Sequence, residues 1–149
     1  MTIILDMGGV LMQHNMPECI RRFCEMLGEE GMANTLGMKV NAEGLPDSLM
    51  EKFECGLVTT EEFVHTILAN AKEGTTEQQI IDAWNTMHAG IPLERIEQIK
   101  RWKKLGHHLL LLSNNNALHW EDIHAHYDMS IFDQCFASHL VHSHKPNKP

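Results

Sequence analysis

The chain has 149 residues, of which 43% are hydrophobic and 21% charged, as is typical of a single soluble globular domain. The formal net charge is −8, and residues 13–91 carry all of the imbalance, with 13 acidic and 5 basic side chains against 7 of each elsewhere. Such a surface repels nucleic acid phosphates and anionic lipids. We therefore expect neither a nucleic acid nor a membrane partner.

The N-terminus lacks the features of a signal peptide, because no basic segment precedes its first apolar run and that run ends at Asp6. The longest later apolar run, residues 109–112, is too short to span a bilayer. We expect a cytoplasmic protein with reduced cysteines. Cys135 and the histidines near it could form a zinc site, but their spacing matches no strong zinc pattern, and we assign none.

The first predicted element is a strand over residues 2–5, which ends in a glycine turn. Helices dominate the next stretch. One begins near Pro17 and is expected to end at Gly28. Two more begin at capping boxes, formed by Thr59 with Glu62 and by Thr75 with Gln78. Three or four helices are therefore expected between residues 16 and 90.

The second half alternates helices and strands. Pro92 opens a helix with Leu93, Ile96 and Ile99 facing inward, and residues 103–106 end it. Residues 108–112 form the second strand. Asn116 is the predicted N-cap of a helix over residues 117–126. A third strand is predicted within residues 132–137.

This order of elements predicts an α/β fold, a Rossmann-like doubly wound parallel sheet with an inserted helical cap. Residues 1–13 and 91–149 would form the α/β core domain, incomplete at its C-terminal end. Residues 14–90 would form the helical cap.

Three chemically useful side chains follow the predicted strands. Asp6 comes after the first strand, Ser113 after the second, and Lys145 in the loop beyond the third. Ligands of parallel sheets bind beyond the carboxyl ends of the strands, so these groups are expected to converge. A carboxylate nucleophile, a hydroxyl donor and a fixed cation are the groups that displacement at phosphorus requires.

The segments around these residues resemble the motifs of the haloacid dehalogenase-like hydrolase superfamily, in its sugar-phosphate phosphatase-like branch. Residues 3–11 are similar to the first motif, residues 110–116 to the second, and Ser138 with residues 145–147 to the third. Residues 53–63 resemble the helical cap. The resemblance implies that Asp6 is the nucleophile and that Ser113 binds the phosphoryl group, with Asn114 as a second substrate-binding residue. It also implies that Lys145 stabilises the nucleophile and the transferring phosphoryl group.

The resemblance also implies a Mg²⁺ ion, held by the Asp6 carboxylate and the main-chain carbonyl of Gly8. Many members carry a second aspartate at the position of Gly8 as general acid and base, and its absence here weakens leaving-group protonation. The fourth motif, an acidic pair that completes the magnesium site, is expected beyond Pro149, where the printed sequence ends. A chain truncated in this way should bind Mg²⁺ weakly and self-associate through an unpaired sheet edge.

The resulting interpretation is a Mg²⁺-dependent phosphatase that hydrolyses a small phosphorylated metabolite through an aspartyl-phosphate on Asp6. One alternative is a metal-independent dehalogenase that uses the same nucleophile on carbon. Another is an inactive remnant that acts only as a binding protein.

Overall fold

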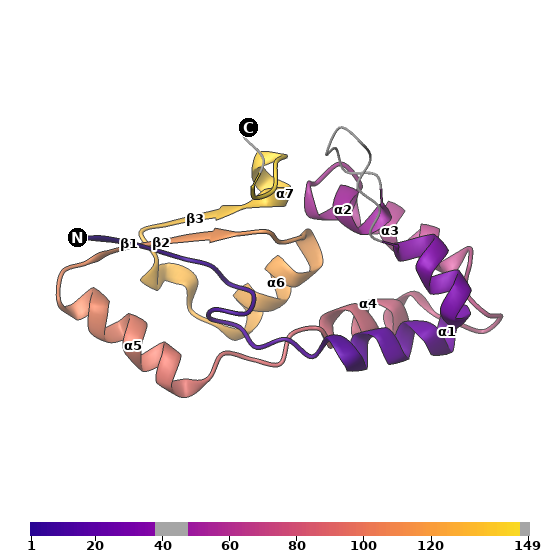
Figure 1. Cartoon of the computed structure of the whole chain (residues 1–149), viewed down its shortest axis with the longest axis horizontal. Coiled ribbons are helices and arrows are strands. Elements are labelled where there is room, and N and C mark those ends of the chain that lie inside the picture. Colours follow the sequence, from indigo (N-terminus) through magenta and orange to yellow (C-terminus); the bar gives the residue numbers. More distant parts are fainter. Residues whose placement is uncertain (38–47, 147–149) are drawn as a thin grey trace.

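The computed structural model describes residues 1–37 and 48–146 (Figure 1). Three parallel strands form one sheet in the order β1 (Thr2–Leu5), β2 (His108–Ser113) and β3 (Gln134–Ala137). Ile3 pairs with Leu109, and Leu111 pairs with Cys135. Because the strands are parallel, their carboxyl ends lie at one edge of the sheet.

Helices α5 (Leu93–Lys104) and α6 (Ala117–His126) connect the strands and lie on the same side of the sheet (Figure 1). Leu109 and Leu111 point to that side and are fully buried against Ile99 of α5 and Ile123 of α6. Burying each of these side chains contributes roughly 2 kcal/mol. A short 3₁₀ turn, Met129–Ile131, leads into β3.

The opposite face of the sheet is apolar and exposed. Register and strand alternation place Ile4, Leu112 and Phe136 together on this face. The first is 62% exposed, and the other two about 40%. The apolar sequence of β1 therefore does not indicate a strand covered on both sides within the described residues.

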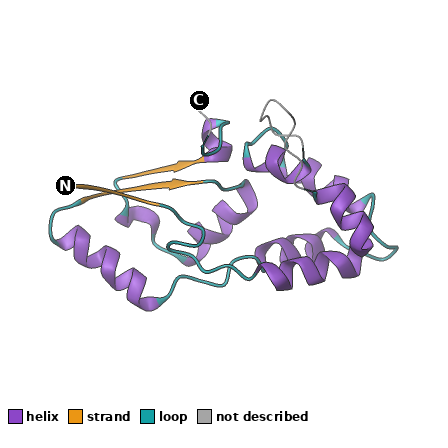
Figure 2. Cartoon of the chain, viewed as in Figure 1, coloured by secondary structure: helices purple, strands orange, loops and turns teal. Residues whose placement is uncertain are grey.

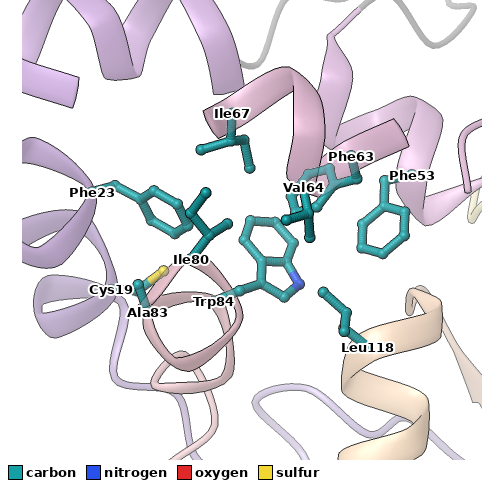
Figure 3. Packing of buried hydrophobic residues seen from close by; sticks show 10 residues of the cluster. All are labelled: Cys19, Phe23, Phe53, Phe63, Val64, Ile67, Ile80, Ala83, Trp84 and Leu118. Atoms are coloured by element: carbon teal, nitrogen blue, oxygen red, sulfur yellow. The ribbon is translucent and has the colours of Figure 1, made fainter. Parts of the chain in front are cut away.

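Four helices form a second group beside the sheet (Figure 2), namely α1 (Met16–Leu36), α2 (Leu49–Glu54), α3 (Thr60–Leu68) and α4 (Glu77–Asn85). Trp84 of α4 is the centre of their core (Figure 3). Its ring makes edge contacts with Phe23 at 6.1 Å and Phe63 at 4.8 Å between centroids. Leu118 of α6 joins the same cluster, so this core continues onto the sheet-covering helices.

The helical group also contacts the sheet through α2 and the short helix α7 (Ser138–Val141). Gly56, just after α2, has a φ of 65° that favours glycine. A Cβ atom at this position would lie 2.3 Å from the main-chain oxygen of His139. His142 adds a hydrogen bond between its Nδ1 and the carbonyl of Cys55, at 3.1 Å. A glycine is therefore required where the two parts meet.

Most of the predicted elements are confirmed, with three corrections of detail. The first helix continues past Gly28, which interrupts it with a φ of 73°, to Leu36. The second capping box is formed by Thr76 with Gln79, one residue later than predicted. Leu93 is 67% exposed and does not face the core.

The α/β class with a parallel sheet is confirmed. The division into a core and a cap over residues 14–90 stays a prediction. No helix within residues 1–37 and 48–146 is long and apolar enough to cross a membrane.

Candidate active site

The three predicted catalytic residues lie together at the carboxyl edge of the sheet. Asp6 directly follows β1, Ser113 is the last residue of β2, and Lys145 follows α7. The Lys145 Nζ atom lies 2.7 Å from Asp6 Oδ2. The other carboxylate oxygen of Asp6 accepts a hydrogen bond from the Met7 amide at 2.8 Å. The carboxylate is thus fixed by a cation and a main-chain donor, and its charge is balanced.

Lys145 is held in place by hydrogen bonds to the end of β2. Its ammonium group donates to the Leu112 carbonyl at 2.8 Å. Its amide donates to Asn114 Oδ1 at 2.7 Å, and its carbonyl accepts from Asn114 Nδ2 at 3.1 Å. Both polar groups of the Asn114 side chain therefore contact the main chain of Lys145. In this conformation Asn114 positions the lysine, and its predicted contact with a substrate stays a prediction.

Ser113 and the residues after it form a tightly hydrogen-bonded loop. Ser113 is almost completely buried, and its hydroxyl donates to the Asn114 carbonyl at 3.2 Å. The Asn115 amide donates to the hydroxyl oxygen of Ser138 at 2.8 Å. That hydroxyl also lies within hydrogen-bonding distance of the Glu54 carbonyl. Ser138 therefore joins the ends of β2 and β3 to helix α2.

A cavity of about 310 Å³ opens over these residues. Asp6, Gly8, Ser113, Asn114 and Lys145 form its lining on the sheet side. Met7 and the segment after β2, with Asn115, Asn116 and His119, also line it. Side chains of the helical group and its connections form the rest, namely His14, Met16, Met50, Glu54, Met87 and His88. The cavity thus has one polar end at the sheet, which contains the Asp6–Lys145 ion pair, and a mixed end made by thioethers, imidazoles and one carboxyl group.

Three histidines that line this cavity lie one after another, and we call this row the histidine stack. The His119 and His88 rings are 4.0 Å apart, and the His88 and His14 rings are 6.5 Å apart and nearly parallel. His119 is buried, with Nε2 2.9 Å from the Trp84 carbonyl and Nδ1 3.1 Å from Asn116 Nδ2. Since the carbonyl only accepts and the amide nitrogen only donates, these contacts fit a neutral ring protonated on Nε2. Burial lowers the pKa of His119 to about 3.

Glu54 is the acidic side chain that the helical group contributes to the cavity. Burial, with a smaller contribution from the charge of Glu51, raises its pKa to about 7. Its carboxyl group has no hydrogen bond or ion pair with any residue that the structure describes. Glu54 can therefore exist as a neutral acid or as a carboxylate near physiological pH.

The two predicted magnesium ligands are the Asp6 carboxylate and the Gly8 carbonyl, and both residues line the cavity. Oxygen atoms are the ligands that Mg²⁺ prefers, and waters commonly complete its octahedron, so the donors present fit this ion in type. Within residues 1–37 and 48–146, no three His, Cys, Asp or Glu side chains gather closely enough to hold a metal ion. The two predicted ligands would fill two of the six positions.

Three side chains that were not predicted from the sequence also line the cavity, namely His14, Glu54 and His88. His14 and His88 lie between the motifs. Glu54 lies within residues 53–63, the segment that resembles the helical cap, but no local pattern gives it a role. All three reach the site only through the packing of the helical group. Asn147, quoted within the third motif, lies outside the described residues.

Comparison with known proteins finds no matching family model and no matching curated protein. Solved structures do match. A HAD family enzyme from Bacteroides thetaiotaomicron, in complex with magnesium and inorganic phosphate, has 24% sequence identity and a TM-score of 0.77, with coverage of 97% of this chain and 71% of its own. A predicted HAD-like family hydrolase from Porphyromonas gingivalis has 27% identity and a TM-score of 0.78, with coverage of 98% and 70%.

HAD is the abbreviation for haloacid dehalogenase, the superfamily that the sequence motifs resemble. The likeness extends over almost the whole of this chain, so both the sheet and the helical group belong to the shared fold. The chain therefore has the fold of the haloacid dehalogenase-like hydrolase superfamily, which confirms the resemblance drawn from its sequence.

Proposed function

We propose that the protein is a Mg²⁺-dependent phosphatase of a small phosphorylated metabolite and that Asp6 is its nucleophile. The observation that carries the proposal is the 2.7 Å ion pair between Asp6 and Lys145, beside Ser113 at the carboxyl edge of the sheet. The magnesium and phosphate bound to the Bacteroides thetaiotaomicron enzyme, which shares this fold, support the same chemistry.

In the proposed reaction, a phosphate monoester binds with its phosphoryl group between Ser113 and Lys145. An Asp6 oxygen attacks phosphorus, and the bond to the leaving oxygen breaks, which forms an aspartyl-phosphate. Water then attacks that phosphorus and returns Asp6 to its carboxylate. The ammonium group of Lys145 and the hydroxyl of Ser113 stabilise the charge that develops on the phosphoryl oxygens.

A bound Mg²⁺ would supply charge neutralisation between the two anions, Asp6 and the phosphate. Asp6 and the Gly8 carbonyl would hold it, together with waters. Because the described residues hold no group of three His, Cys, Asp or Glu side chains that could bind a metal, we expect these two ligands to bind the ion weakly. Calorimetric titration with MgCl₂ measures this affinity directly, and tight binding would contradict the ligand set.

Residues 14–90 act in this proposal as a cap that selects the substrate. The side chains that this segment places in the cavity are Met16, Met50 and Met87 with the polar groups of His14, Glu54 and His88. They would contact the alcohol part of the ester, while the sheet residues contact the phosphate.

The test is the hydrolysis of p-nitrophenyl phosphate by the wild-type protein, by Asp6→Asn and by the control Asp82→Asn, whose carboxylate lies on the exposed surface of α4. We expect Asp6→Asn to abolish turnover with an unchanged circular dichroism spectrum, because it removes the nucleophile and nearly preserves the side-chain shape. The control should retain wild-type activity. Equal turnover by Asp6→Asn and the wild type would refute the proposal.

A further inference from the structure

The imidazole of His14 occupies the space into which a side chain at position 8 would project. A Cβ atom built on Gly8 would lie 2.7 Å from His14 Nε2 and 2.8 Å from His14 Cε1. Non-bonded heavy atoms need about 3.5 Å, so the His14 ring would have to move before a side chain at position 8 could fit. Unlike Gly9, with its φ of 73°, Gly8 is not in the left-handed region. In this conformation the His14 ring, and not the backbone, takes up the space beside position 8.

His14 is held at this position from both sides. The Gln13 amide donates to the Gly90 carbonyl at 2.9 Å, and the Asn15 amide donates to the Met87 carbonyl at 2.8 Å. The ring of His14 also stacks on His88, the middle member of the histidine stack. These contacts place one imidazole, exposed to the cavity, beside a residue only two positions after Asp6.

Hydrolysis of an alkyl phosphate requires a proton donor at the leaving oxygen, because an alkoxide is a poor leaving group. Most of the candidate donors in the cavity have other roles. Lys145 is paired with Asp6, and both ring nitrogens of His119 are hydrogen-bonded. His14 has no hydrogen-bond partner among the described residues. Glu54, which enters the cavity from α2, and His88, whose Nδ1 lies 3.8 Å from Asp122 Oδ2, are the alternative donors.

We propose that His14 is the general acid and base of the reaction, with Nε2 acting from the space that a side chain at position 8 would fill. This role rests on the proposed phosphatase function. As Asp6 attacks phosphorus, the electron pair of the breaking P–O bond moves to the leaving oxygen, which takes the proton from His14 Nε2. When water attacks the aspartyl-phosphate, its proton returns to His14 Nε2, and the P–O bond pair returns to Asp6.

Esters of similar size with different leaving groups test this role. One substrate is p-nitrophenyl phosphate, whose phenolate leaves without being protonated. The other is benzyl phosphate, whose alkoxide must be protonated as it leaves. We expect His14→Ala to lower kcat/KM for benzyl phosphate on the order of a hundredfold, with a much smaller loss for p-nitrophenyl phosphate. Glu54→Gln should not produce this difference. His65→Ala, an exposed histidine of α3, is the matched control.

A double variant tests whether a carboxylic acid at position 8 can take over the role of His14. Gly8→Asp alone should lower the thermal stability, because its Cβ meets the His14 ring. In His14→Ala with Gly8→Asp the space is free, and the new carboxylic acid can supply the proton. We expect the double variant to regain both the stability and much of the benzyl phosphate activity.

Equal losses of His14→Ala on both esters, or a selective loss for Glu54→Gln in its place, would overturn the assignment. Additive effects of the two substitutions on stability would show that the positions do not exclude each other, which also overturns it. If the wild-type protein and every variant hydrolyse neither ester, the proposed phosphatase function fails, and the role of His14 fails with it.

Discussion

Acid should destabilise this protein through His119. The ring is buried, stacked on Trp84 at 5.2 Å, and bonded as a neutral tautomer between the Trp84 carbonyl and the Asn116 amide group. Protonation would place a second N–H on Nδ1, facing the amide donor of Asn116. The folded pKa is about 3, against 6.5 for an ordinary histidine. Below about pH 6.5 the unfolded chain therefore binds a proton that the folded chain excludes.

This difference in pKa sets the direction and the size of the change in stability with pH. The stability contributed by neutral His119 is complete above pH 6.5 and is lost as the pH falls toward 3. The slope is about 1.4 kcal/mol per pH unit, so the free energy of unfolding should fall by about 2 kcal/mol between pH 6.5 and about pH 5. Burial also lowers the pKa of His88, which adds to the loss in the same direction.

Urea unfolding followed by tryptophan fluorescence between about pH 5 and pH 8 measures the slope. His119→Gln should be less stable at neutral pH, since it leaves cavity space and removes the ring contacts, but its stability should depend less on pH. His124→Gln, an exposed histidine of α6, is the control and should keep the wild-type slope. Parallel slopes for the wild type and His119→Gln would refute the argument.

Three more outcomes are expected. Thr76→Ala removes the N-cap of α4 and should destabilise the protein by about 1 kcal/mol in thermal unfolding. Thr75→Ala should have little effect, and equal losses of stability in the two variants would contradict the capping assignment. Glu54→Gln should raise the free energy of unfolding above pH 7 and much less near pH 5. The pKa of Glu54 is raised in the folded protein, so folding loses stability as this carboxyl group ionises, and an effect independent of pH in urea unfolding would contradict this. We also expect concentration-dependent self-association in light scattering, through the β1 edge and the apolar face beside it, weakened by Ile4→Lys and unaffected by Lys104→Ala at the exposed end of α5.

The elements that the sequence predicts well are those set by local interactions. The strand over residues 2–5 and the helix capped by Asn116 each have an apolar pattern or a cap within a few residues, and both have the predicted bounds. Thr75 and Thr76 each precede a glutamine by three residues, so spacing alone cannot distinguish them. The amide of Thr75 donates to the Lys72 carbonyl within a turn, and the helix consequently begins one residue later.

The candidate site likewise contains some residues that local sequence predicts and others that it does not. Asp6, Ser113 and Lys145 were predictable because each follows a strand or resembles a motif, and parallel strands bring their ends together. The positions of His14 and Glu54 depend on how the helical group packs against the sheet. The sequence separation between Glu54 and Ser138, which contact each other, exceeds eighty residues, and no local pattern encodes such a contact.

Gly56 sets the clearance between the helical group and the sheet. With a hydrogen atom in place of a side chain, α2 approaches α7 until their main chains nearly touch, and Glu54, two residues earlier, reaches the cavity. A methyl group at position 56 would hold the two parts further apart and move Glu54 away from the sheet end of the cavity. The depth of the cavity, and with it the size of the molecule that fits there, is therefore controlled by a residue that does not itself line the cavity.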